Sequence, residues 1–114
     1  MKPPQEEPRR IECTEGSEPV NLSLGEEFYV QFHRHGSVGE DAEFEIEDES
    51  VVTHLVTETE YLHPERLKPG WTGGDAERGR WFFRACGRGE TALVIRTLFR
   101  FEVESTCTIC VHVD

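Results

Sequence analysis

Apolar and polar residues alternate along most of this chain. In residues 28–32, for example, Phe28, Val30 and Phe32 point to one face of an extended segment. A period of two is typical of a β-strand with one buried face. No segment longer than ten residues carries the apolar stripe with a period of 3.6 residues that an amphipathic helix needs. The pattern therefore predicts strands and negligible helix.

The alternating segments are short and separated by turn residues, which is the spacing expected of a β-sandwich. They cover residues 20–24, 28–32, 42–48, 50–59, 80–85, 90–99 and 106–113. The sequence therefore predicts an all-β fold, an antiparallel Ig-like β-sandwich of about seven or eight strands. Its expected core consists of Phe28, Val30, Phe32, Phe44, Ile46, Leu93, Ile95, Ile109 and Val111.

A length of 114 residues fits a single domain with one core. Residues 1–12 contain three prolines and charges of both signs, so we expect a flexible tail there and the sandwich over residues 13–114. No window approaches the roughly 18 consecutive apolar residues of a membrane span, and we expect no membrane partner. The first residues lack the apolar region of a signal peptide, so we expect either a cytoplasmic protein or a chain whose leader has been removed.

Charge and motifs narrow the class of function. The net charge of -11 argues against a nucleic-acid partner, because such proteins need a basic surface to displace counterions. Ser37 lies near His33 and His35, but no nucleophile elbow surrounds it. The glycines of residues 70–74 are not followed by the helix or the Lys-Ser/Thr pair of a phosphate-binding loop. We therefore expect no enzymatic activity and no cofactor; His33 and His35 could bind a metal ion only weakly.

Four cysteines occur, at Cys13, Cys86, Cys107 and Cys110. The pair Cys107 and Cys110 matches C-x-x-C, but it lies in an alternating segment, where these two side chains point to opposite faces. The sequence has no second C-x-x-C to complete a tetrahedral site, so we expect no structural zinc. If a disulfide forms, we expect it to involve Cys107 or Cys13.

Two predicted connections, residues 33–42 and 62–79, are long for a small sandwich. Ordered long loops often carry function. Trp71 lies in the second connection among glycines, and the sequence leaves two roles open for it. Its ring either folds back to cap the core or contacts a partner.

From about residue 20 to its C-terminus the chain resembles the chagasin family of cysteine protease inhibitors, which present three neighbouring loops on a β-sandwich. Their first loop has the motif Asn-Pro-Thr-Thr-Gly-aromatic; here "HGSVG" keeps the glycine as Gly39 and has Ser37 in place of threonine, while the Asn, Pro and aromatic are replaced. Their second motif is Gly-X-Gly-Gly, and "GWTGG" keeps the double glycine. Their third motif is Arg-Pro-aromatic, and Phe101 alone retains it, as the aromatic.

The resemblance implies a reversible inhibitor of papain-type cysteine proteases that occludes the active-site cleft, with a papain-type enzyme as partner and a monomeric inhibitor. It implies that Gly39 needs either a positive φ or a close approach to the partner. It also implies that Ser37, Trp71 and Phe101 share one end of the sandwich, with Ser37 in the middle. The implied protease-binding residues are His35, Gly36, Ser37, Val38, Gly39, Gly70, Trp71, Thr72, Gly73, Gly74, Phe99, Arg100 and Phe101.

A second hypothesis fits the same residues. Glu40 and Asp41 stand where the family has an aromatic residue after the glycine. This replacement favours an Ig-like interaction or structural module that has kept the chagasin fold and lost protease inhibition. The sequence leaves both functions open.

Overall fold

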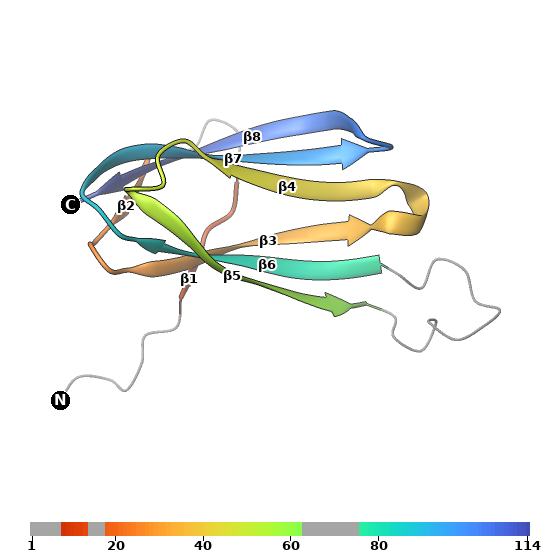
Figure 1. Cartoon of the computed structure of the whole chain (residues 1–114), viewed down its shortest axis with the longest axis horizontal. Helices are drawn as coiled ribbons and strands as arrows, with labels where there is room; N and C mark the ends of the chain where they lie inside the picture. Colours follow the sequence, from red (N-terminus) through yellow and green to blue (C-terminus); the bar gives the residue numbers. More distant parts are fainter. Residues whose placement is uncertain (1–7, 14–17, 63–75) are drawn as a thin grey trace.

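The computed structural model describes residues 8–13, 18–62 and 76–114, and within them the chain is all-β (Figure 1). The elements are β1 (Arg9–Arg10), β2 (Val20–Leu22), β3 (Glu27–His35), the single-turn 3-10 helix η1 (Gly36–Val38), β4 (Glu40–Ile46), β5 (Val52–Tyr61), β6 (Ala76–Ala85), β7 (Gly89–Phe99) and β8 (Glu102–Val113). The predicted all-β class with about seven or eight strands is confirmed. Within these residues, no helix is long and apolar enough to span a membrane.

The strands lie in two layers. Strands pair in the order β2-β8-β7-β4 and β3-β6-β5, with β1 beside β3. The two groups are joined at one residue pair, His35 with Glu40, next to η1, and the network does not close into a barrel. The ring of Phe44 on β4 packs edge-on against Trp81 and Phe83 of β6, with ring centroids 5.2 and 5.1 Å away. The two sheets therefore face each other as a sandwich.

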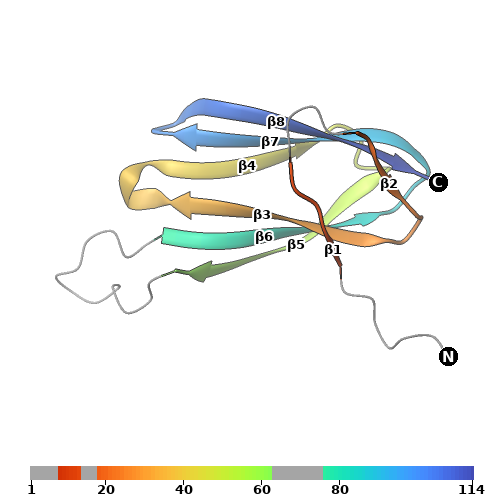
Figure 2. The same cartoon turned by 180° about the vertical axis from the view of Figure 1, so that it is seen from behind.

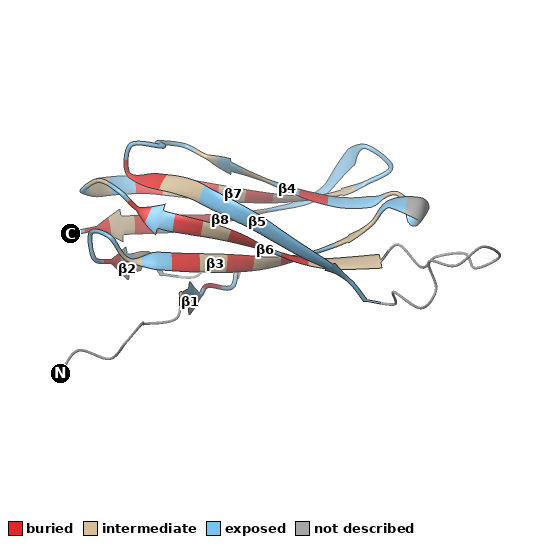
Figure 3. Ribbon diagram, turned by 60° about the horizontal axis from the view of Figure 1, so that its bottom comes forward, coloured by how far each residue is buried: buried red, intermediate tan, exposed pale blue. Residues whose placement is uncertain are grey.

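The core lies between these sheets and follows from the alternation. Buried positions alternate with half-buried or exposed positions along strands such as β3 and β6 (Figure 3). Seven predicted core residues are buried, and Phe44 and Ile46 are half-buried against them. Aromatic contacts fill the centre: Phe28 stacks on Phe83 at 5.2 Å, and Phe32 stacks on Trp81 at 4.0 Å. Such pairs add a preferred geometry to the burial of apolar area.

The N-terminal segment differs from the predicted flexible tail. Arg9 and Arg10 pair in parallel with β3, and the N–H of Ile11 donates to the carbonyl of Tyr29 at 2.9 Å. Ile11 is only 7% exposed, because its apolar side chain joins the core. β2 then pairs in parallel with β8, in the other sheet (Figure 2). Residues 9–11 therefore belong to the sandwich, although the sequence assigns them to the tail; residues 1–7 lie outside the described residues.

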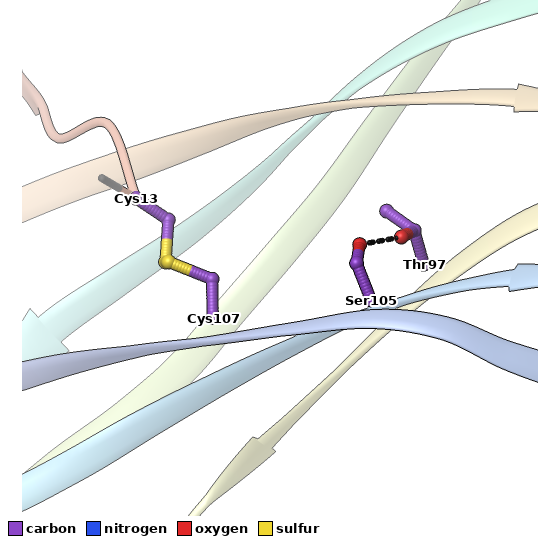
Figure 4. Close-up of a disulfide and its surroundings, with 4 residues drawn as sticks. All are labelled: Cys13, Thr97, Ser105 and Cys107. Atoms are coloured by element: carbon purple, nitrogen blue, oxygen red, sulfur yellow. Dashed lines mark hydrogen bonds between the residues drawn. A yellow bond between two sulfur atoms is a disulfide. The ribbon is translucent and has the colours of Figure 1, made fainter. Parts of the chain in front are cut away.

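A disulfide joins Cys13 to Cys107 of β8, with the two Cα atoms 6.1 Å apart (Figure 4). This pairing confirms the expectation that a disulfide involves one of these two cysteines. Cys107 points to the same face of β8 as the buried Ile109, whereas Cys110 is exposed on the other face. The alternation along β8 therefore separates the two cysteines of the C-x-x-C pattern, as predicted. Cys86 and Cys110 are free thiols.

Candidate functional site

Two of the connections between consecutive strands lie side by side at one end of the sandwich, which we call the loop end (Figure 1). It carries residues 36–39 between β3 and β4, and Arg100 and Phe101 between β7 and β8 (Figure 1). The paired ends of β5 and β6 lie at the same end, where the N–H of Leu62 donates to the carbonyl of Ala76 at 2.8 Å. Consecutive antiparallel strands turn at alternate ends of a sandwich. The β3–β4 and β7–β8 connections therefore lie at the same end. Phe101 and the first loop therefore share an end.

The first loop turns tightly through η1. Gly39 ends it with φ 84°, in the left-handed region, and its N–H donates to the carbonyl of Gly36 at 3.0 Å. The expectation that Gly39 needs a positive φ is confirmed, since this conformation is costly for a residue with a Cβ atom. His35 ends β3 at the base of the loop, and Val38 is exposed at its surface (43%). The loop thus presents mostly small side chains and backbone.

The third loop is a two-residue hairpin in which both residues are left-handed. Arg100 has φ 52° and Phe101 has φ 72°. Such a turn matches the right-handed twist of the strands, but it normally uses Asn or Gly. Phe101 is 99% exposed, and the guanidinium carbon of Arg100 lies 5.1 Å from the centre of the Phe99 ring. Unfavourable backbone conformations at large exposed residues are typical of functional sites.

The first and third loops contact each other directly. The N–H of Arg100 donates to the carbonyl of Gly39 at 2.7 Å. A Cβ atom on Gly39 would lie 2.9 Å from the Cγ of Arg100, so the two loops leave no room for a side chain at this position. Between them is a hollow of about 180 Å³. Its lining is Arg34, Gly36, Gly39, Glu40, Asp41, Leu98, Arg100 and Phe101.

An ion pair that the sequence analysis missed closes the base of the first loop. The Nε of Arg34 on β3 donates to the Oδ1 of Asp41 on β4, and the same oxygen accepts from the N–H of Ala42 at 2.7 Å. The carboxylate of Asp41 is therefore held against the loop base. Glu40 remains exposed beside it. In the sequence, Arg34 and Asp41 have opposite charges, and each lies two positions from the turn of residues 36–39. This symmetric placement is the signal from which the ion pair could have been predicted.

The second predicted loop carries the remaining candidate residues. Gly70, Trp71, Thr72, Gly73 and Gly74 lie outside the described residues, and so does the predicted place of Trp71. The side chain of Ser37 is likewise not described. The structure thus brings Gly36 and Gly39 together with Arg100 and Phe101 around one hollow, and Val38 lies in the turn between the two glycines. Phe99 ends β7 beside them.

Two pKa shifts belong to residues outside the first and third loops. Hydrogen bonds from Ser50 lower the pKa of Asp48, and a hydrogen bond to Glu45 raises the pKa of Arg96. Both groups sit in surface pairings that keep them charged. Across residues 8–13, 18–62 and 76–114, no group of three or more His, Cys, Asp or Glu side chains is arranged to hold a metal ion.

The fold matches solved structures although the sequence does not match known families. The sequence matches no protein-family model and none of the curated proteins with which it was compared. The crystal structure of the cysteine protease inhibitor EhICP2 from Entamoeba histolytica superposes with a TM-score of 0.72 at 12% identity, covering 93% of this chain and 95% of that one. The solution structure of amebosin gives a TM-score of 0.59 at 15% identity, covering 96% and 100%.

These identities are low, so the likeness establishes the fold. The chain is a β-sandwich protein of the chagasin-like fold, the fold of EhICP2. The family resemblance drawn from its loops and strand rhythm is therefore confirmed at the level of architecture.

Proposed function

We propose that this protein is a reversible inhibitor of papain-type cysteine proteases. The observation that carries the proposal is the direct contact of the first and third loops at one end of a chagasin-like sandwich, through the bond from the Arg100 N–H to the Gly39 carbonyl. A cleft-binding wedge needs neighbouring loops with a fixed relative position. The fold of EhICP2, a cysteine protease inhibitor, supports the same function.

The proposed mechanism is occlusion without chemistry on the inhibitor. The backbone and small side chains of the first loop lie over the catalytic thiolate of the protease, and the outer loops grip the cleft on either side. A first loop held by backbone hydrogen bonds, from the Gly39 N–H to Gly36 and from the Arg100 N–H to Gly39, loses little conformational entropy on binding. The protein acts as a monomer and needs no cofactor. It is not an enzyme in this proposal.

The proposed anchor of the third loop is Phe101. Its ring is almost fully exposed on a two-residue turn, where it is ready to bury apolar area in a cleft. The second loop, residues 70–74, completes the proposed binding surface. Arg100 and Phe99 would contact the rim of the same cleft.

The alternative function is an interaction module without protease inhibition. The exposed Glu40 beside Gly39 favours it, because a carboxylate must lose its hydration to enter a narrow cleft. Asp41 is a weaker objection, since its carboxylate is bound by Arg34 at the base of the loop. Inhibition measurements separate the two functions.

We expect the substitution Phe101→Gly to weaken inhibition of papain on the order of 30-fold, which corresponds to the loss of an interface anchor worth about 2 kcal/mol. The free energy of unfolding should stay within about 1 kcal/mol of the wild type, because glycine relieves the left-handed strain while adding entropy to the unfolded chain. Inhibition constants and urea unfolding curves measure the two effects.

Leu24→Ala is the matched control, since Leu24 is an exposed apolar residue in the β2–β3 connection at the opposite end of the sandwich (Figure 1). It should leave inhibition unchanged. If Phe101→Gly inhibits as strongly as the wild type, the third loop is no anchor and the proposed wedge is wrong at that point.

A further inference from the structure

The N-terminal strap, residues 8–13, is held to the sandwich by few non-covalent contacts. β1 pairs only two residues with β3, and Ile11 adds one backbone hydrogen bond and one buried side chain. Arg9 pairs with Glu26 at 3.2 Å and donates to the carbonyl of Asn21 at 2.8 Å, but Arg9 and Asn21 are exposed to water and Glu26 is only half-buried. Exposed ion pairs of this kind hold a segment weakly.

A hollow of about 280 Å³ lies beside the strap and is open to solvent. The strap residues from Arg10 to Cys13 form one side of the hollow, and Val30, Gln31 and Ile95 form the other. Val30 and Ile95 are core residues of the two opposite sheets. The strap therefore crosses the open side of the sandwich, and Ile11 is the one side chain of residues 8–13 that the structure buries.

The disulfide supplies the covalent hold. β1 belongs to the sheet of β3, whereas Cys107 lies on β8 in the other sheet, so the bond ties the strap across both sheets (Figure 4). It joins residues 94 apart in sequence. Cys110 points away from this bond, and the Sγ of Cys86 lies 3.4 Å from the carbonyl oxygen of Ser50 at another part of the fold. Neither free thiol is placed to re-form the bond with Cys107.

We propose that the disulfide between Cys13 and Cys107 is a redox latch that controls the strap. A dithiol reductant opens it: one thiolate attacks a sulfur to give a mixed disulfide, and the second thiolate displaces the protein thiol. The products are two cysteine thiols on the protein and the oxidised dithiol. The strap is then free to detach, which exposes Ile11 and the edge of β3, while the loop end stays folded. This inference does not depend on the proposed inhibition.

With this latch, the position of the strap depends on the redox conditions around the protein. In an oxidising environment the bond persists and the strap stays closed. In a reducing environment the strap opens, and an extended segment that contains Arg9 and Arg10 becomes accessible to proteases. The rate at which proteases cut the strap therefore depends on the thiol redox state.

Limited trypsin digestion tests the latch, with intact-mass measurement of cleavage after Arg9 or Arg10. Dithiothreitol treatment of the wild type, and separately the substitution Cys107→Ser, should each speed this cleavage at least tenfold. Cleavage after Arg88, in the exposed turn between β6 and β7, is the internal reference and should keep its rate. The matched control Cys110→Ser should behave as the oxidised wild type.

Two results would overturn the latch. The first is an unchanged rate of cleavage after Arg9 and Arg10 on reduction. The second is an equal acceleration after Arg88, which would mean that the whole domain opens. Hydrogen exchange at the Ile11 amide gives an independent reading: its protection should be lost on reduction, whereas the Arg100 amide, bonded to Gly39, should keep its protection.

Discussion

The substitution Gly79→Val should lower the free energy of unfolding by about 3 kcal/mol, the upper range for overpacking a well-packed core. A Cβ atom at Gly79 would lie 2.2, 2.5 and 2.7 Å from three atoms of the Phe32 ring. That ring has little freedom to move away, because it is buried, stacked on Trp81 at 4.0 Å and covered by the guanidinium of Arg34 at 5.2 Å. Urea unfolding monitored by tryptophan fluorescence measures the loss.

Thr59→Val is the control for this substitution. Thr59 pairs directly with Gly79 across β5 and β6, but it is exposed, so the same valine should change stability by less than about 0.5 kcal/mol. A Gly79→Val protein as stable as the wild type would show that the Phe32 ring does not pack against the β6 backbone.

The substitution Gly39→Val should weaken inhibition of papain about 100-fold, equivalent to about 2.7 kcal/mol. Its Cβ would push against Arg100 and separate the first loop from the third, and a branched side chain would also hold the loop backbone out of the cleft. Because φ is 84° at this position, valine should also cost about 1–2 kcal/mol of stability through backbone strain. Inhibition constants and melting temperatures, measured together, report both effects.

Gly25→Val separates strain from recognition. Gly25 has a similar φ of 89°, lies in the β2–β3 connection at the opposite end, and has open space where a Cβ would be. It should lose comparable stability and retain full inhibition. Equal loss of inhibition in both variants would mean that Gly39 acts only as a turn former.

The strands could be predicted where apolar and polar residues alternate over several successive positions. Strands of seven or more residues place apolar side chains on one face repeatedly, and Phe28, Val30 and Phe32 on β3 show this directly. β1 has two residues, too few to display a period, whereas β2 falls within the predicted strand of residues 20–24. Their parallel partners, β3 and β8, lie far away in sequence, so only tertiary packing selects them. The sequence pattern therefore places Ile11 in a tail, whereas the structure buries it in the core.

The candidate site was predictable in position more than in detail. The order of strands predicts that the first and third loops share an end, and Gly39 marks its own left-handed conformation. The left-handed turn at Arg100 and Phe101 could not be predicted, because arginine and phenylalanine rarely adopt this conformation. The bond between Arg100 and Gly39 depends on a contact between two separate hairpins, which no local pattern encodes.

The most direct measurement is inhibition of papain and of a cathepsin L-type enzyme by the wild-type protein, at several concentrations of a peptide substrate. We predict reversible inhibition of at least one enzyme, with one inhibitor bound per active site and with an apparent inhibition constant that rises linearly with substrate concentration. Such competition is what occlusion of the cleft by the loop end requires. No inhibition of either enzyme at micromolar inhibitor, or inhibition that is independent of substrate concentration, would contradict the proposed function and leave the chagasin-like sandwich as an interaction module.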